Sequence, residues 1–377
     1  MRAPRRVVCA PNAFKGTVSA ELAATAMVAG VREAGAGGVA IPVADGGDGT
    51  LDVLLAAGGS EATTTRHRVT GPLGRPVDAR LGWLAGSTAI VEMAEASGLR
   101  LLPADDLAPL LATSRGAGEL LAAALDAGAA RVIVGVGGSA STDGGAGLLQ
   151  ALGARLLDAH GEEIGAGGGE LARLEHVDLS GLHPGISRTV IDVASDVRNP
   201  LSGPDGAAFV FAPQKGATSA DVAILDAALT RFARIAERDL RAAGLADMAG
   251  SGAAGGAGFA LALIGATLLS GAALVCDLVG LDAALNGAEL ALTGEGSLDE
   301  QTAFGKAPAE VAARAQRAGV PCAVIAGRVV HPAAGGFVRV ISLEEVAGAV
   351  EARRDAARLI QQAARQVVEE LLGAGPQ

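Results

Sequence analysis

The stretch Ala291-Leu-Thr-Gly-Glu-Gly-Ser-Leu-Asp-Glu-Gln-Thr-Ala-Phe-Gly-Lys306 joins an apolar run to a turn that carries acids, glycines and a lysine. Two earlier stretches share this design: Ile41-Pro-Val-Ala-Asp-Gly-Gly-Asp-Gly49 and Val8-Cys-Ala-Pro-Asn-Ala-Phe-Lys-Gly16. Because open α/β sheets bind ligands at the carboxyl ends of their strands, we expect these three loops to meet at one sheet edge. Backbone amides, carboxylates and lysines there suit a metal-bound phosphate, which predicts a phosphoryl-transfer enzyme.

The order of elements predicts one α/β domain interrupted by another. The chain begins strand, helix, strand, helix, which is typical of a parallel sheet with covering helices. From Glu61 the sequence is β-branched and polar, as in antiparallel strands, and after Asp277 the β/α alternation returns. We therefore expect a doubly wound α/β domain at 1–63 plus 275–377. A mixed-sheet α/β domain would be inserted at 64–274, with a cleft between the two domains.

Composition excludes several classes of protein. Half of the 377 residues are hydrophobic and 19% are charged, so the chain is not a largely disordered protein. Aromatic residues make up 2% and the net charge is −11, which argues against a nucleic-acid partner. Residues 251–276 carry no charge but lack flanking cations and aromatic anchors, so we expect a buried helix with a glycine-rich start rather than a membrane span.

The cysteines indicate a reducing compartment. Cys9, Cys276 and Cys322 lie far apart and show no zinc-ligand spacing, so we expect three reduced thiols. The basic N-terminus is followed by an apolar run at 7–10 only, which is too short for a signal peptide. These features predict a cytoplasmic protein.

Asp45 and Asp48 flank Gly46 and Gly47 at a strand–helix junction. The glycines permit a sharp turn, and two carboxylates three residues apart could face one magnesium ion or its waters. A tight turn in which Asp48 caps the following helix is the alternative.

Lysines accompany two of the three loops. Lys15 lies at the first strand–helix junction, where helix amides already favour anions. Lys306 closes the loop that contains Asp299 and the sequence Gly294-Glu-Gly296. This loop is not a Walker A motif, because Glu300 occupies the position of its first glycine.

Gly135-Val-Gly-Gly-Ser-Ala140 follows an apolar run and fits the dinucleotide pattern G-x-G-x-x-A, with Asp158 as a candidate ribose ligand. Against NAD, the carboxylate of Asp143 would repel a pyrophosphate bound nearby. The alternative is an anion-binding turn with hydroxyls from Ser139, Ser141 and Thr142.

Asp196-Val-Arg-Asn-Pro200 ends another apolar run. A carboxylate held there can accept a proton from a substrate hydroxyl, whereas an Asx turn before proline is the structural alternative. Lys215 adds a cation nearby in sequence. His67, between Arg66 and Arg68, could touch an anion, and the other histidines show no metal or triad spacing.

The ordered motifs resemble one family. The segments A-P-N-A-F-K-G, A-D-G-G-D-G-T, T-S-R-G-A-G-E-L, G-V-G-G-S-A-S-T-D-G-G-A-G, D-V-R-N-P-L, A-P-Q-K-G-A, G-A-A-G-G-A-G and T-G-E-G-S-L-D-E-Q-T-A-F-G-K are similar to the bacterial glycerate kinase type-1 family. The resemblance covers roughly residues 7–330 and departs at Ser139–Asp143 and at Ser297, where Arg is common. It implies ATP- and Mg²⁺-dependent phosphorylation of D-glycerate to 2-phosphoglycerate. It also implies that the active site lies in a cleft between two α/β domains, one flavodoxin/Rossmann-like and one inserted.

The residues can then be given expected roles. Catalysis should be mainly positioning and charge stabilisation. We expect a monomer or homodimer with no nucleic-acid or membrane partner. The candidate residues are: for catalysis, Asp196 as proton acceptor with Asp299 second, and Lys15; for substrate, Arg66, Ser139, Asn199 and Lys215; for nucleotide phosphates, Gly46, Gly47, Gly294, Glu295, Gly296 and Lys306; for metal, Asp45 and Asp48.

Two other functions remain open at the level of sequence. An NAD-dependent hydroxy-acid oxidoreductase would use the loop from Gly135 to Ala140. A non-catalytic small-ligand sensor would not need so many carboxylates beside lysines.

Overall fold

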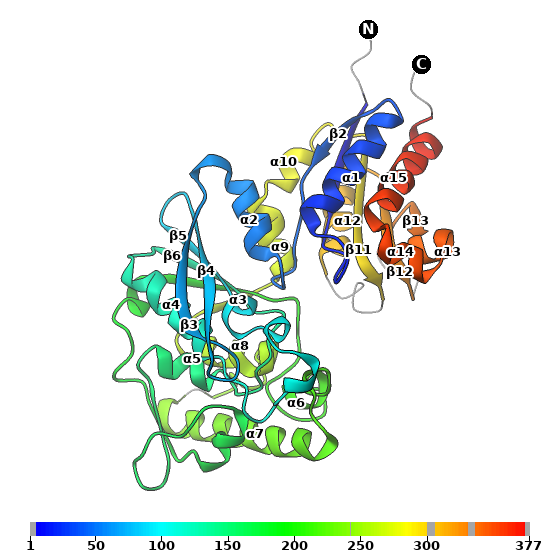
Figure 1. The fold of residues 1–377 in the computed structure, drawn as a ribbon. Helices are drawn as coiled ribbons and strands as arrows, with labels where there is room; N and C mark the ends of the chain where they lie inside the picture. Colours follow the sequence, from blue (N-terminus) through cyan, green and yellow to red (C-terminus); the bar gives the residue numbers. More distant parts are fainter. Residues whose placement is uncertain (1–4, 242, 300–305, 331–335, 374–377) are drawn as a thin grey trace. The chain divides into compact units, whose positions relative to one another are not determined.

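The computed structural model describes residues 5–241, 243–299, 306–330 and 336–373, and these form two compact units (Figure 1). The first contains 1–45, 52–57 and 270–377, and the second contains 46–51 and 58–269. Each unit is built on its own sheet. The expected domain limits at 63/64 and 274/275 stay a prediction.

The first unit contains a five-stranded sheet whose pairings are all parallel. In sheet order the strands are β13 (Arg339–Ser342), β12 (Cys322–Val329), β11 (Leu290–Leu298), β1 (Arg6–Pro11) and β2 (Gly37–Ala40). Successive side chains of β1 point to opposite faces, so Val7 and Cys9 join one apolar core while Val8 and Ala10 join another.

Helices cover both faces of this sheet (Figure 1). On one side are α1 (Ala20–Glu33), α13 (Leu343–Ala347), α14 (Ala349–Arg354) and α15 (Ala356–Leu372), and on the other α9 (Gly271–Leu278), α10 (Leu281–Leu285) and α12 (Ala307–Arg317). The hydroxyl of Ser19 accepts a hydrogen bond from the amide of Leu22 and so caps α1. The α/β fold class with a doubly wound parallel sheet is confirmed.

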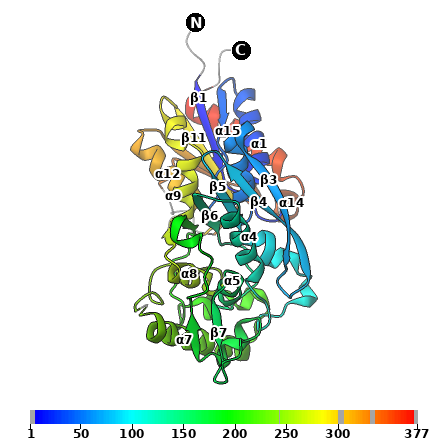
Figure 2. The same cartoon turned by 90° about the vertical axis from the view of Figure 1, so that its left-hand side faces the viewer.

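The second unit contains a six-stranded mixed sheet (Figure 2). In sheet order its strands are β10 (Thr267–Leu269), β9 (Val190–Ala194), β6 (Arg131–Gly135), β5 (Thr88–Glu92), β4 (Pro76–Leu84) and β3 (Thr63–Thr70). Strands β3, β4 and β5 pair antiparallel, and the pairings from β5 through β10 are parallel. A separate two-stranded sheet pairs β7 (Arg155–Leu157) with β8 (His176–Asp178).

Helices complete the second unit, and α2 contributes residues to both units. They are α2 (Thr50–Gly58), α3 (Met93–Ser97), α4 (Arg115–Asp126), α5 (Ala146–Ala151), α6 (Ala207–Phe211), α7 (Ser219–Leu240) and α8 (Ala253–Leu263). Short 3₁₀ helices occupy Gly59–Glu61, Leu99–Leu101, Ala104–Asp106, Gly168–Arg173, Ile186–Arg188 and Pro213–Lys215.

Some predicted elements are wrong in detail. The uncharged stretch 251–276 is not one helix: α8 ends before Gly265, which has φ of +88°, and β10 and α9 follow. Strand β11 continues into the stretch expected as a turn and pairs with β12 as far as Leu298. After β13 the chain forms three separate helices, α13, α14 and α15, divided at Gly348 and Asp355. In the described part of the chain, no helix is both long and apolar enough to cross a bilayer.

Candidate active site

The carboxyl edge of the five-stranded sheet gathers several of the predicted residues. The amide of Asn12, just after β1, donates to the carbonyl of Gly294 at 2.8 Å. The Asn12 side-chain amide donates to Asp45 Oδ2 at 3.2 Å. The chain leading to Asp45 stays beside β1, because Val43 N donates to Pro11 O. The loop that follows β1 and the chain segment that leads to Asp45 therefore meet at this edge, beside Gly294.

Lys15 and the stretch 294–299 lie at the same edge. A Cβ placed on Gly296 would stand 3.1 Å from the amide nitrogen of Lys15, so the glycine permits this close approach. Lys306 Nζ lies 3.8 Å from Asp299 Oδ1. The structure thus brings together Lys15, Asp45 and Gly294–Gly296, with Asp299 and Lys306 on the same loop. The part of that motif at 300–305 lies outside the described residues.

In the second unit, the loop of Gly46 and Gly47 packs on the loop that follows β6. Gly137 N donates to Gly46 O at 2.9 Å. A Cβ on Gly46 would come within 2.1 Å of the carbonyl oxygen of Ala194, and a Cβ on Gly138 within 2.6 Å of Asp48 Oδ2. Three backbone loops therefore approach one another at the ends of β6 and β9, with Asp48 against one of them.

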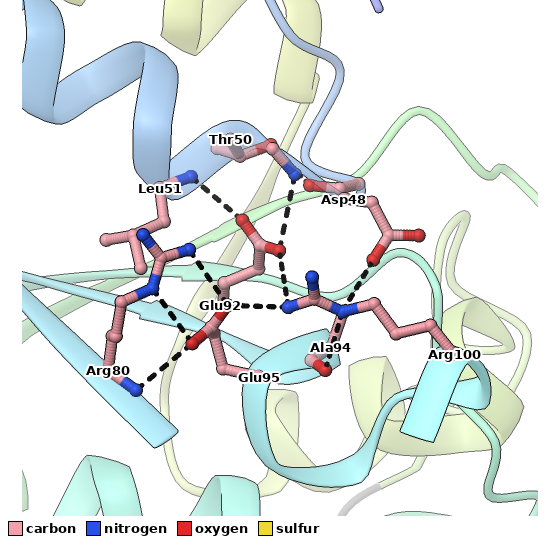
Figure 3. A network of polar contacts seen from close by, with 10 residues as sticks. Asp48, Thr50, Leu51, Arg80, Glu92, Ala94, Glu95 and Arg100 are labelled. Carbon is pink, nitrogen blue, oxygen red and sulfur yellow. Dashed lines mark hydrogen bonds and ion pairs between the residues drawn. The ribbon is translucent and has the colours of Figure 1, made fainter. Parts of the chain in front are cut away.

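Glu92, at the end of β5, fixes the chain just after Asp48 (Figure 3). Its carboxylate accepts the amides of Gly49 at 3.3 Å and Leu51 at 2.9 Å, so it is Glu92 that holds the start of α2. The side chain is only 2% exposed. Burial raises the pKa of Glu92 to about 7, although the two amides oppose this shift.

Two arginines hold a second buried acid beside Glu92 (Figure 3). Glu95 is bonded by Arg80 Nη2 at 3.0 Å and by Arg100 Nη2 at 2.5 Å. Burial favours a higher pKa for Glu95, but the hydrogen bonds from Arg80 and Arg100 together outweigh it and lower the pKa to about 2. We did not predict this cluster from the sequence. Its signal was available, because Glu92 and Glu95 also follow an apolar strand.

Lys215 is buried against the loop that follows β6. Its ammonium donates to Ser139 Oγ at 3.1 Å and to Ser141 O at 2.5 Å. The residue is 3% exposed, and burial lowers its pKa to about 8 while the charge of Asp143 opposes the shift. The hydroxyls of Ser141 and Thr142 are also buried, and neither has a hydrogen-bond partner among the described residues. The loop is therefore polar and cationic, as an anion site requires.

Asp143 and Asp158 do not form a dinucleotide site. Asp143 is fully buried and accepts both the amide and the hydroxyl of Ser114 at 2.8 Å, so it organises the loop from within. Asp158 follows β7 in the small separate sheet and is paired with Arg173 at 2.8 Å. It therefore does not stand at the end of the strand next to β6, where a ribose ligand would be needed.

The remaining predicted residues are divided between two places. Asp196 and Asn199 follow β9, and Asn199 donates to the carbonyl of Asp205 at 2.7 Å. Arg66 lies on β3, the edge strand, with β4, β5 and β6 between it and β9. In sheet order Arg66 is thus separated from the strand ends that carry Ser139 and Asp196, and the choice between Arg66 and Lys215 for an anionic substrate group stays a prediction.

The carboxylates present can accommodate magnesium without an all-protein cage. In the described ranges, no three His, Cys, Asp or Glu side chains are grouped as metal ligands. Mg²⁺ commonly uses one or two carboxylates together with phosphates and waters. Asp48 fits this need, because its side chain is 42% exposed and its Oδ1 has no hydrogen-bond partner among the described residues.

Comparison with known proteins identifies the family. The model of the glycerate kinase family matches residues 7–372. The chain belongs to the glycerate kinase family. It is 47% identical over 328 residues to the glycerate kinase of Bacillus subtilis (strain 168), covering 86% of this chain and 85% of that protein. It is 46% identical over 326 residues to the glycerate 2-kinase of Escherichia coli (strain K12), covering 85% of each.

A solved structure supports the same placement. A crystal structure of a Salmonella typhimurium LT2 protein assigned as a glycerate kinase 2 superposes with a TM-score of 0.83 at 43% identity, covering 98% of both chains. Members of the glycerate kinase family are ATP-dependent phosphotransferases, so this chain is a kinase. The resemblance noted in the sequence and the enzyme class are confirmed.

Proposed function

We propose that this glycerate kinase family member transfers the γ-phosphoryl group of ATP to a hydroxyl of D-glycerate, giving 2-phosphoglycerate. The observation that carries the proposal is the family match across residues 7–372, together with relatives named glycerate kinase and glycerate 2-kinase. We further propose a cytoplasmic monomer or homodimer whose partners are small molecules.

The proposed metal and phosphate site uses acids and lysines at the strand ends. Asp45 and Asp48 would hold Mg²⁺ directly or through its waters. When bound, the ion would neutralise charge on the phosphate oxygens. Lys15 and Lys306 would add positive charge for the phosphates, with the backbone of Gly46, Gly47 and 294–296 offering close approach.

The proposed glycerate site uses the second unit. Lys215 is already held by Ser139 and can pair with the carboxylate of glycerate, with Asn199 as a further polar contact. Asp196 would accept the proton of the attacking hydroxyl, and Asp299 is the second candidate. Because the proposed residues are shared between the two units, we propose that catalysis needs both, in a cleft between domains at 1–63 plus 275–377 and 64–274.

An ADP-release assay across small hydroxy acids tests the substrate, and phosphorus NMR of the product tests which hydroxyl is phosphorylated. We expect activity with D-glycerate and a 2-phosphate product. Binding of NAD without binding of ATP would instead favour an oxidoreductase, and absence of ATP turnover with every hydroxy acid would favour a ligand sensor.

The proton acceptor is tested by Asp196→Asn, which removes the base but keeps the shape of the side chain. We expect kcat to fall at least about 100-fold, the usual contribution of a general base. The matched variant Asp299→Asn reports on the second candidate. Turnover of Asp196→Asn within about tenfold of the parent enzyme would exclude Asp196 from this role.

A further inference from the structure

Asp48 carries a carboxylate oxygen that the fold leaves without a hydrogen bond. Its Oδ1 is buried and has no hydrogen-bond partner among the described residues, although the side chain as a whole is 42% exposed. Arg100 Nε lies 3.6 Å from Oδ1, which is an ion-pair distance but too long for a hydrogen bond. Arg100 therefore orients this carboxylate electrostatically from its buried side, and the exposed part of the Asp48 side chain stays accessible to a cation.

Arg100 is itself held by other groups of the same unit. Its Nη2 donates to Glu95 at 2.5 Å and stands 4.0 Å from Glu92, and its Nε donates to the carbonyl of Ala94 at 3.4 Å (Figure 3). Glu95 is in turn fixed by Arg80. The planar guanidinium is thus anchored in a buried acidic cluster and presents one edge to Asp48.

The backbone beside Asp48 is fixed by the same cluster. Glu92 holds the amides of Gly49 and Leu51, so the chain immediately after Asp48 cannot shift without breaking two hydrogen bonds to a buried carboxylate. The backbone beside Asp48 is therefore restrained by Glu92, at the end of β5, and its side chain is restrained by Arg100.

A half-exposed ion pair such as that of Arg100 with Asp48 adds little to the stability of a fold. Fold stability alone is thus a weak reason for placing Arg100 beside Asp48.

We propose that Arg100 is a positioning residue, which orients the Asp48 carboxylate toward the divalent cation of the bound nucleotide. The proposal rests on the proposed function, because that function assigns Asp48 to magnesium. Arg100 acts through Asp48 and need not touch either substrate.

A double-mutant cycle separates this role from a structural one. The variants are Arg100→Ala, Asp48→Asn and the double variant, with Arg100→Lys as the charge-keeping variant. Arg75→Ala is the matched control, because Arg75 forms an exposed ion pair with Asp106 in the same unit. Binding of Mn²⁺ with the non-hydrolysable analogue AMP-PNP is followed by loss of the free Mn²⁺ EPR signal. The Mg²⁺ dependence of ADP release is followed in parallel.

We expect Arg100→Ala to weaken Mn²⁺ binding and to raise the Mg²⁺ requirement, each about tenfold, while the KM for glycerate changes less than about twofold. Arg100→Lys should recover part of this loss, and Arg75→Ala should match the parent enzyme. In the Asp48→Asn background, removing Arg100 should change Mn²⁺ binding less than about twofold, since residues that act through one contact are not additive.

Three results would overturn the inference: an equal loss in both backgrounds, an Asp48→Asn variant that binds Mn²⁺ like the parent, or a weakened Arg100→Ala whose melting temperature has also fallen well below that of Arg75→Ala. A parent enzyme that does not phosphorylate glycerate would contradict the proposed function instead, and the Mn²⁺ cycle would still decide the role of Arg100.

Discussion

Two buried ionisable groups of opposite charge make the stability of this kinase depend on pH in opposite directions. Glu92 is held by backbone amides, and Lys215 by a hydroxyl and a carbonyl. In each case the partners do not fully replace the water lost on burial, so the neutral form is favoured in the folded chain.

For Glu92 we expect stability to fall as pH rises from about 4.5 to about 7. The folded protein keeps a proton that the unfolded chain releases in this window, so the favourable contribution is complete below pH 4.5 and lost above pH 7. The change amounts to about 3 kcal/mol. Urea unfolding at pH 5 and pH 8 measures it, and Glu92→Gln should lack this part of the pH dependence. Glu92→Gln also loses one amide contact, which should lower the free energy of unfolding by the same amount at both pH values. An unchanged difference between the two pH values would exclude Glu92 as its source.

For Lys215 the expected slope is reversed. Its pKa is lowered to about 8 from 10.5, so the unfolded chain binds a proton that the folded chain lacks between these values. Stability should therefore rise by about 3 kcal/mol from pH 8 to pH 10.5 in the parent and not in Lys215→Met. If the free energy of unfolding changes with pH by the same amount in the parent and in Lys215→Met, Lys215 is not the source of this slope.

At the residue scale, the sequence predicts the loops better than the partners inside them. Asp48 and Lys215 stand out because they carry charge at turns. Their partners come from parts of the chain remote in sequence: Glu92, at the end of β5, contacts Gly49, and Ser139, in the loop after β6, contacts Lys215. A local sequence pattern does not predict such contacts, because they depend on the register in which β5, β6 and β9 pair.

At the scale of elements, a glycine contact sets how closely two strand-end loops approach. Gly46 has φ of +86°, and a Cβ there would lie 2.1 Å from the carbonyl oxygen of Ala194. Gly49 has a similar φ of +90°, but its Cβ would meet nothing within 4 Å. The two glycines therefore separate the effect of backbone strain from the effect of a clash.

We expect Gly49→Ala to lower the free energy of unfolding by about 1–2 kcal/mol through its left-handed backbone alone. Gly46→Ala should cost at least about 1 kcal/mol more, because the loop must move away from β9 as well. Urea midpoints with unchanged m values give this comparison, and kcat should fall further in Gly46→Ala than in Gly49→Ala. Equal losses for both variants would show that the contact with Ala194 is not restrictive.

Elements with local signals were predicted correctly, and those without them were not. A serine that can cap a helix, Ser19, precedes α1, and the β-branched, polar sequence after Glu61 forms β3 and β4. In 251–276 the residues are apolar on every side, so periodicity cannot separate helix from strand. The positive φ angles of Ala254, Gly255 and Gly256 and the pairing of β10 with β9 divide that stretch, and both depend on tertiary contacts.

At the scale of the whole molecule, the change of sequence texture predicts the interruption of one α/β unit by another, but not how often the chain passes between them. The segment 46–51 belongs to the second unit although it follows the first parallel strands directly. Its hydrogen bonds to Glu92 and Gly137 account for this, and both partners are remote in sequence.

The proposed site residues are distributed over both units. Lys15, Asp45, Asp299 and Lys306 belong to the first unit, whereas Asp48, Ser139, Asp196 and Lys215 belong to the second. If both groups serve one phosphoryl transfer, the two units must approach each other around ATP and glycerate, which also excludes water that would hydrolyse ATP. We expect small-angle scattering to show a smaller radius of gyration with Mg²⁺, AMP-PNP and glycerate together than with either substrate alone. Asp48→Asn should weaken this change, and Arg75→Ala, which removes only an exposed ion pair with Asp106, should retain it. Scattering curves that do not respond to the ligands in a catalytically active sample would mean that the two groups already meet without closure.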